Sequence, residues 1–315
     1  MNLMDQSKNP KNISFHQVEW NSALAEHVAK EAARWFIEDL GYESDWTSVG
    51  LVSASAACTL DVVVRNEGVI AGLEAARVVI DVSEFDVEWH PEVSDGMPVS
   101  DGTVVARIAG LTRSVLATER VILNLLGRMS GVASATKRLV DAVDGTTCQI
   151  FDTRKTIPGW RLLDKLAVRL GGGWNHRLGL YDAILIKDNH LAALANTGKG
   201  PGDAVRQAKS FIAQAFSPER ADNMVVEVEL DELDSLTEVL QAGANIVLLD
   251  NMTPAMMAEA VAMRDGSPHK AILEASGGVR PETAGAIART GVDRISSGWP
   301  THHAPWIDVG LDWKN

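Results

Sequence analysis

The chain is poor in cysteine, in tyrosine and in basic residues. Its 315 residues include 2 cysteines and 2 tyrosines, and 29 Lys and Arg stand against 42 Asp and Glu, for a net charge of −13. The two isolated thiols, Cys58 and Cys148, exclude a disulfide scaffold and suit a reducing compartment. The acidic balance excludes the broad basic faces that bind nucleic acids or anionic membranes.

Long hydrophobic runs are also missing. No apolar stretch approaches the roughly 20 residues of a membrane span, and the polar N-terminus up to Pro10 has no hydrophobic signal core. We therefore expect a cytoplasmic protein that contacts neither membranes nor nucleic acids. Residues 1–12 are expected to form a disordered lead.

The first part of the chain predicts an α/β domain. Apolar residues recur at helical spacing from Val18 to Leu40, and Gly41 is a typical helix stop. Apolar stretches between glycines predict strands at 58–64, 68–72 and 102–110. A long helix follows over 112–143, with Gly127 and Gly131 as weak points, and we place a domain boundary inside it near Leu125. Residues 13–125 then form the first domain.

Short apolar strands alternate with helical stretches in the second part, residues 126–300. The predicted strands lie at 148–151, 183–186, 224–228, 245–249, 271–273 and 292–295. This rhythm requires parallel strands joined by crossover helices. A β/α barrel is favoured over an open doubly wound sheet, because no strand is followed by a GxGxxG turn.

Polar residues follow the predicted barrel strands at their carboxyl ends, where a β/α barrel builds its active site. These residues are Asp152, Lys187, Glu229, Asp250, Ser276 and Ser297. Glu229 and Asp250 offer the hard oxygen ligands that Mg²⁺ prefers, although an ion pair with Lys187 would also explain them. The turns Ser276-Gly277-Gly278 and Ser297-Gly298 suit a phosphate.

Cations gather in three segments of this acidic chain: residues 152–159, 171–177 and 186–190. They contribute Arg154, Lys155, His176, Arg177 and Lys187, with Arg161 on the following helix. Each one alone reads as a solvated surface charge. Together they predict a pocket for a small ligand that carries carboxylate and phosphate groups, since Arg supplies a planar fork and Lys a compact charge. The adjacent pair His302 and His303 is interpreted as structural, because no third metal ligand is evident.

These motifs resemble the quinolinate phosphoribosyltransferases, the type II phosphoribosyltransferase family. The resemblance covers nearly the whole chain. Its most specific parts are the TER segment from Thr118, DTRKT-PG from Asp152, GGG-NHR-GL from Gly171, IKDNH from Ile186, VEVE from Val226, LLDN from Leu248 and EASGG from Glu274. It implies an incomplete, seven-stranded β/α barrel with a smaller N-terminal α/β sandwich domain, onto which residues 301–315 pack back. It also implies homodimers with shared active sites.

Carried over by residue, the resemblance assigns a complete site. Quinolinate would be surrounded by Arg154, His176, Arg177 and Lys187, with Arg120 reaching it from the partner subunit. Lys155, Glu229 and Asp250 would hold 5-phosphoribosyl 1-pyrophosphate and its Mg²⁺, and Ser276, Gly277 and Gly298 its 5′-phosphate. The implied catalytic residues are Lys187, Glu229 and Asp250. The implied reaction makes nicotinate mononucleotide, pyrophosphate and CO₂ for NAD biosynthesis.

Two other functions are consistent with parts of the sequence. A Schiff-base aldolase could use Lys187 as its nucleophile, but this leaves the DTRKT segment and the acidic pair unexplained. A paralogue with another acidic substrate, or with a binding role alone, should have lost some of the cations, and none is missing. Trp299 is bulkier than the family's usual residue after Gly298 and either narrows the phosphate pocket or fills the barrel bottom. The glycine-rich segment Gly198–Gly202 is expected to be a flexible loop.

Overall fold

The computed structural model describes residues 15–195 and 198–313, and within them the chain forms two compact units. The barrel unit comprises residues 15–17, 138–157 and 173–299. The sandwich unit comprises residues 18–137, 158–172 and 300–313. The expected disordered lead over residues 1–12 lies outside the described residues, as do residues 196 and 197 next to the glycine-rich segment.

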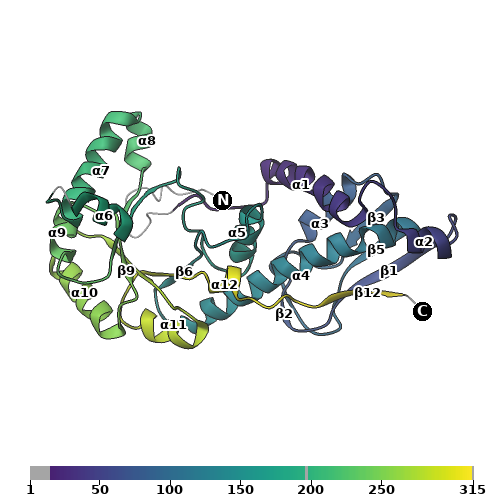
Figure 1. The fold of residues 1–315 in the computed structure, drawn as a ribbon. Coiled ribbons are helices and arrows are strands. Elements are labelled where there is room, and N and C mark those ends of the chain that lie inside the picture. The colour runs from purple at the N-terminus through teal and green to yellow at the C-terminus, as the bar shows by residue number, and fades with distance from the viewer. Residues whose placement is uncertain (1–14, 196–197, 314–315) are drawn as a thin grey trace. The chain divides into compact units, whose positions relative to one another are not determined.

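The sandwich unit contains an antiparallel sheet in which the C-terminal segment supplies an edge strand (Figure 1). The strand order is β12 (Val309–Trp313), β1 (Ala57–Val64), β5 (Val104–Leu111) and β3 (Val87–Pro91). Val62 pairs with Leu311 across β1 and β12. A second, two-stranded sheet joins β2 (Gly68–Val69) and β4 (Pro98–Val99). Residues 301–313 thus complete the sheet that the sequence places at the start of the chain.

The sandwich unit also contains helices, and two of them begin at side-chain caps, on Asn21 and Asp45. The helices are α1 (Ser22–Leu40), α2 (Trp46–Leu51), α3 (Leu73–Asp81), α5 (Arg161–Leu170) and the first part of α4 (Thr112–Ala142). The Asn21 side chain accepts the Leu24 amide at 3.0 Å, which starts α1 four residues later than the apolar spacing predicts. Gly41 ends it with a positive φ of 64°.

The two glycines of α4 do not interrupt the helix, which runs unbroken as predicted. A Cβ at Gly127 would lie 2.9 Å from the carbonyl of Ile307, and one at Gly131 would lie 3.0 Å from the Cα of Trp306. The glycines therefore serve close packing, because the C-terminal segment crosses α4 at these positions. The two units divide between residues 137 and 138, within the same helix in which we expected a boundary near Leu125.

The barrel unit is built on a parallel six-stranded sheet. Its order is β6 (Gln149–Phe151), β11 (Arg294–Ser296), β10 (Ile272–Ser276), β9 (Ile246–Asp250), β8 (Val226–Leu230) and β7 (Ile184–Ile186). Trp174 adds an isolated parallel bridge to Phe151 beyond the β6 edge. The barrel is incomplete, as expected. Among its described residues it has six strands where seven were expected, and the Trp174 bridge takes the place of the seventh.

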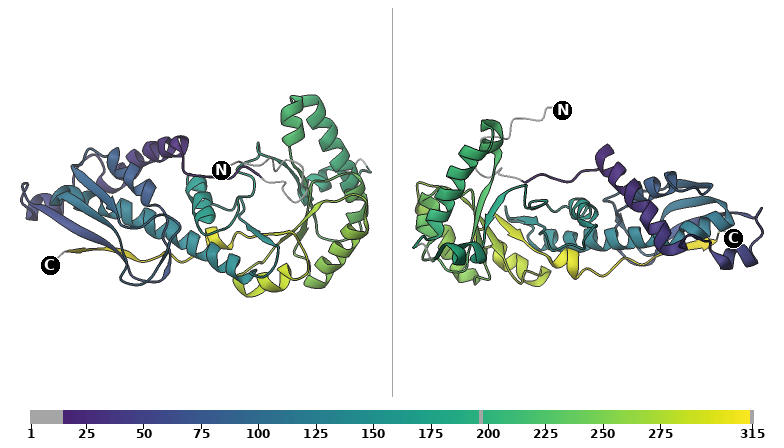
Figure 2. Two further views of the ribbon diagram at one scale, coloured as in Figure 1. Left: turned by 180° about the vertical axis from the view of Figure 1, so that it is seen from behind. Right: turned by 45° about the horizontal axis from the view of Figure 1, so that its top comes forward.

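Helices connect these strands as the sequence rhythm predicts. They are α6 (Asp188–Ala195), α7 (Pro201–Ala215), α8 (Pro218–Asn223), α9 (Leu236–Gln241), α10 (Pro254–Gly266) and α11 (Pro281–Ala288), and the short α12 (Trp299–His302) follows β11. The helices α9, α10 and α11 lie along the outer side of the sheet (Figure 1), and Figure 2 shows the same arrangement from two further directions. No helix among the described residues is long and apolar enough to cross a membrane.

Both thiols are free, and they differ in burial. Burial, with the nearby charge of Asp293, raises the pKa of Cys148 to about 12, whereas Cys58 is half-buried on β1. Because the thiolate is the nucleophile, we expect iodoacetamide at pH 8 to label Cys58 alone in the folded protein and both residues after unfolding. Mass spectrometry of the labelled peptides measures this. Rapid native labelling of Cys148 would contradict the buried position of the thiol.

Candidate active site

Alternation along the barrel strands divides their side chains between two environments. On β8, Val226, Val228 and Leu230 belong to the large apolar cluster that includes helix residues, whereas Glu227 and Glu229 point to the other face. The inner face is sealed at the strand starts by a small apolar cluster. That cluster consists of Phe15, Phe151, Ala183, Val225, Ile246 and Ile272. Polar residues follow Val225 and Ile272 at two and four positions further along the chain, and follow Ala183 and Ile246 at four positions.

The carboxyl ends of the strands carry the polar residues that the sequence places there. Lys187 follows β7, Glu229 lies in β8, and Asp250 and Ser276 end β9 and β10 as register partners. Lys187 Nζ donates to Glu229 Oε2 at 2.5 Å, so the ion pair that we weighed as an alternative is formed. An ammonium paired with a carboxylate is a poor nucleophile, which counts against the aldolase interpretation.

Asp250 ends β9 with a half-buried carboxylate. Among residues 15–195 and 198–313 no cationic side chain pairs with the Asp250 carboxylate. Its one hydrogen bond there comes from the side-chain amide of Asn251, at 2.8 Å. Half-buried carboxylate oxygens at the open end of a barrel are ligands that suit Mg²⁺, which binds through one or two carboxylates and keeps waters or phosphates in its other positions. Asp250 and Glu229 therefore fit this ion.

Two arginines lie close enough to repel each other. Burial lowers the pKa of Arg177, and the positive charge of Arg154 lowers it further. Arg177 Nη1 donates to the Ala183 carbonyl at 3.2 Å, and Arg154 Nε is buried without a hydrogen-bond partner among the described residues. An anion that both guanidinium groups can bind would stabilise such a pair.

The His176 backbone and ring are held from three sides. The Asp152 carboxylate accepts the His176 amide at 2.7 Å and the Asn175 side chain at 2.8 Å. Ring atom Nε2 lies 3.2 Å from an oxygen of Glu227 and 3.3 Å from one of Glu274. Burial opposes a charge on the ring, but the two carboxylates outweigh it and raise the pKa of His176 to about 10.

Glu227 and Glu274 are buried site residues that our reading of the sequence did not select. Both side chains are fully inaccessible, in the middle of β8 and β10. The signal was present, because each is an acid inside an otherwise apolar buried strand: Glu227 alternates with Glu229 in VEVE, and Glu274 is the single acid of LEAS. We assigned functional roles only at strand ends, and these residues lie one interior layer below them.

The turn after β10 requires glycine. Gly277 has a φ of +97°, and a Cβ there would lie 2.9 Å from the Asn251 amide nitrogen and closer still to the Asn251 side chain. Asn251 itself has a left-handed φ of 54°, and its amide donates to the Ser276 carbonyl at 2.9 Å. Backbone of this kind presents N–H groups to an anion.

We expect Gly277→Ala to destabilise the fold by about 1–3 kcal/mol, because alanine is strained at this φ and collides with Asn251. Thermal or urea unfolding measures the loss. Gly278→Ala is the matched control: its φ is also positive, at +60°, but no atom lies within 4 Å of a Cβ there. Equal destabilisation of both variants would show that backbone strain explains the loss and that the collision with Asn251 contributes nothing.

The remaining predicted residues have separate locations. Lys155 is exposed after β6, and Gly298 is half-buried after β11. Trp299 packs against the large apolar cluster of the barrel unit, with Arg138 5.2 Å from its ring centre. Arg120 is exposed on α4 in the sandwich unit, where its guanidinium contacts Glu119 at 3.2 Å. Ser297 donates to the Val279 carbonyl at 3.0 Å and is structural.

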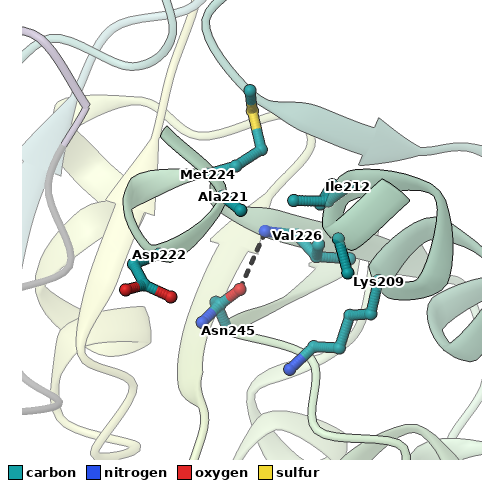
Figure 3. A pocket seen from close by; sticks show the side chains of 8 residues that line it. Lys209, Ile212, Ala221, Asp222, Met224, Val226 and Asn245 are labelled. Atoms are coloured by element: carbon teal, nitrogen blue, oxygen red, sulfur yellow. Dashed lines mark hydrogen bonds between the residues drawn. The ribbon is translucent and has the colours of Figure 1, made fainter. Parts of the chain in front are cut away.

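A cavity of about 300 Å³ opens at the opposite ends of the strands (Figure 3). It is lined by residues that include Lys209, Asp222 and Asn245, and Val226 at the start of β8 forms part of its wall. The Val226 amide donates to the Asn245 side chain at 2.8 Å across it. None of the predicted site residues lines this cavity, which is distinct from the candidate site.

Comparisons with known proteins show the family of this chain. Family models described as quinolinate phosphoribosyl transferase, N-terminal domain and C-terminal domain, match residues 45–130 and 132–312. A nicotinate-nucleotide pyrophosphorylase [carboxylating] of Mycobacterium leprae is 41% identical over 278 residues, which is 87% of this chain and 93% of the relative. A quinolinate phosphoribosyltransferase [decarboxylating] of Nicotiana glauca is 34% identical and covers 87% of this chain and 80% of its own length.

Solved structures of the same family have a similar fold. The structure of a nicotinate-nucleotide pyrophosphorylase from Francisella tularensis superposes with a TM-score of 0.84 at 35% identity, covering 95% of this chain and 99% of its own. Both domains, most of the length and the interior arrangement of the barrel therefore lead to one assignment. The chain belongs to the quinolinate phosphoribosyltransferase family.

Proposed function

We propose that this protein transfers the phosphoribosyl group of 5-phosphoribosyl 1-pyrophosphate to quinolinate and releases nicotinate mononucleotide, pyrophosphate and CO₂. The cation pair of buried Arg177 and half-buried Arg154, close enough for the charge of Arg154 to act on Arg177 in a protein that is acidic overall, carries the proposal. A dicarboxylate satisfies the cations, and a pyrophosphate with Mg²⁺ satisfies Glu229 and Asp250. The carboxylating and decarboxylating names of the relatives describe the two directions of this single reaction.

The residues divide between the two substrates. Arg154, His176, Arg177 and Lys187 surround the pyridine dicarboxylate. Lys155, Glu229 and Asp250 hold the ribosyl pyrophosphate and Mg²⁺, and Ser276, Gly277 and Gly298 bind the 5′-phosphate. Magnesium, when bound, supplies positive charge that stabilises the departing pyrophosphate. Glu229 pairs with Lys187 in the structure. When Mg²⁺ binds, Glu229 must therefore either leave Lys187 or contact both cations.

The charges of the site suit both chemical steps. The pyridine nitrogen attacks C1 of the ribose as the bond to pyrophosphate breaks, and the carboxylates shield the positive charge that develops on the sugar. The ring nitrogen becomes cationic. The bond from C2 to its carboxylate then breaks, CO₂ leaves, and the electron pair at C2 is stabilised by the adjacent N⁺ until a proton replaces it. No covalent bond to the enzyme is needed.

The functional unit in this proposal is a homodimer in the cytoplasm, as part of NAD biosynthesis. Arg120 lies in the sandwich unit, away in sequence from the other cations, and an exposed arginine is available to reach the barrel of a second subunit. The alternative is a paralogue that uses another acidic substrate or only binds one. It is less supported, because every predicted cation and carboxylate is present.

The decisive assay supplies purified protein with quinolinate, 5-phosphoribosyl 1-pyrophosphate and Mg²⁺, and measures nicotinate mononucleotide and CO₂. Nicotinate serves as the parallel acid. We expect equal amounts of both products from quinolinate. Nicotinate has no 2-carboxylate to release as CO₂ or to bind the arginine pair, so we expect neither CO₂ nor nucleotide from it. If a folded protein forms no product from either acid, the result would favour the paralogue.

Removing magnesium should abolish turnover. We expect EDTA to stop the reaction and excess Mg²⁺ to restore it. Asp250→Asn should raise the Mg²⁺ concentration for half-maximal rate at least about tenfold, because the variant loses a charged ligand. Asp265→Asn, an exposed carboxylate at the end of α10, is the matched control and should leave the Mg²⁺ dependence unchanged. An unaltered Mg²⁺ dependence in Asp250→Asn would exclude that residue as a ligand.

A further inference from the structure

Two fully buried carboxylates lie beside the same ring nitrogen of His176, inside the barrel unit. Glu227 on β8 and Glu274 on β10 both approach Nε2 of His176, at 3.2 and 3.3 Å. β9 lies between these two strands, so only the curvature of the sheet brings the carboxylates together. Burying two like charges is costly unless positive or hydrogen-donating groups compensate for it. The proposed chemistry uses neither glutamate.

The other edge of the same ring is also occupied. The backbone amide of Arg177 lies 2.9 Å from Nδ1 and donates to it in the neutral ring that carries its proton on Nε2, between the two carboxylates. A second proton, at Nδ1, would displace the Arg177 amide. The Nε2–H is common to the neutral ring and to the cation. Phe15 stacks on one ring face, with the centroids 4.3 Å apart.

The surroundings supply charges of both signs. Burial opposes ionisation of Glu274, yet its pKa is lowered, because His176, Arg294 and Ser296 stabilise the carboxylate. Arg294 Nε lies 3.7 Å from Glu274 Oε2. The charge of Glu227 also acts on the Arg177 guanidinium. The cluster therefore contains two acids and two neighbouring arginines around one imidazole.

We infer that Glu227 and Glu274 are positioning residues that hold the His176 ring through a protonated Nε2, which the neutral ring and the cation share. The inference rests on the proposed function for its consequence: the pair sets the affinity for quinolinate without binding it. Such supporting contacts hold a binding group in one productive geometry. His176 then connects the glutamates to the Arg154 and Arg177 site, and it offers the substrate its remaining ring surface instead of a free N–H.

A metal ion is the competing occupant. The ligand atoms of His176, Glu227 and Glu274 all lie within 4.8 Å of one another, which a transition-metal ion could bridge. Arg294 Nε lies 3.7 Å from Glu274, and the charge of Glu227 acts on Arg177, so positive charge already lies beside both acids. A dication in this position would be repelled by both guanidinium groups, so the arrangement favours a proton.

The test compares Glu274→Leu with Glu274→Gln, because glutamine keeps an acceptor oxygen and leucine does not. ¹⁵N NMR of the substrate-free protein reports which ring nitrogen of His176 carries the proton, with the signal assigned through His176→Asn. We expect an Nε2–H in the wild type and its loss or averaging in Glu274→Leu. Activity should show a KM for quinolinate raised at least about tenfold, with the KM for 5-phosphoribosyl 1-pyrophosphate changed less than about twofold. Glu274→Gln should be intermediate in both.

Asp164→Asn is the control for losing a buried carboxylate, since Asp164 pairs with Arg128 at 2.9 Å in the sandwich unit. It should lower stability but leave the His176 signals and the ratio of the two KM values unchanged. Unchanged ring signals in Glu274→Leu would overturn the inference, as would stoichiometric Zn²⁺ binding to the wild type that Glu274→Leu abolishes in calorimetry. The NMR measurement needs no substrate, so its result does not depend on the proposed function. If it gives the expected result while quinolinate is not consumed, the proposed function fails and the positioning role stands.

Discussion

Arg154→Ala is expected to lower kcat/KM for quinolinate by well over about tenfold while the protein stays folded. The change removes a guanidinium that can bind a carboxylate through two charge-assisted hydrogen bonds. It also removes a repulsive neighbour of Arg177, since the charge of Arg154 lowers the pKa of that residue. The fold should therefore lose little stability, or gain some, while the site loses affinity. Steady-state kinetics and thermal unfolding measure the two effects separately.

Two further variants sharpen this result. Arg154→Lys keeps the charge but not the planar fork and should recover only part of the activity. Arg161→Ala removes a cation of the same sequence region that begins α5 in the sandwich unit, so its kinetics should resemble the wild type. Wild-type kinetics in Arg154→Ala would exclude the proposed role, and an equal loss in Arg161→Ala would indicate a general charge effect.

Mixing two inactive variants should restore activity if active sites are shared between subunits. Arg120→Ala lacks the residue that we propose one subunit donates, and Lys187→Ala lacks a residue of the barrel. A mixed dimer contains one complete site and one site without either residue. Random exchange makes half of the dimers mixed, so the recovered rate should approach about a quarter of the wild-type rate. The assay follows product after subunit exchange.

The control mixes Lys187→Ala with Arg154→Ala. Both changes lie in the barrel unit, so every barrel of the mixed dimer stays defective and no rate should return. Subunit exchange is checked in both mixtures with differently tagged chains. If Arg120→Ala and Lys187→Ala exchange fully and remain inactive, each site is built within one subunit, and Arg120 has another role.

Most secondary structure could be predicted because its signals are local. Glycine stops, apolar runs and the strand-to-helix rhythm are properties of neighbouring residues, and the barrel strands were found to within a few residues. The start of α1 was misplaced because the Asn21 cap acts against the apolar spacing that extends back to Val18. The seventh strand reduces to the Trp174 bridge, which depends on pairing with Phe151 and leaves little local signal.

The candidate site was predictable where its residues end strands. Parallel strands bring their carboxyl ends to one edge whatever the curvature of the sheet, so Lys187, Glu229 and Asp250 could be grouped from sequence. The sequence alone left open whether Lys187 pairs with an acid. The structure decides this in favour of Glu229, because β7 and β8 are neighbours.

The sequence by itself determined the order of elements, the excess of acid, the local concentration of cations and the family motifs. Tertiary structure alone decided which buried acids meet. Glu227 is 51 residues from His176 along the chain, and Glu274 is on a strand that does not border β8. Strand alternation shows that both acids can face inward, but curvature of the sheet brings them to the same imidazole. The physical reason is that alternation is a local property of each strand, whereas the distance across a barrel depends on all of its strands together.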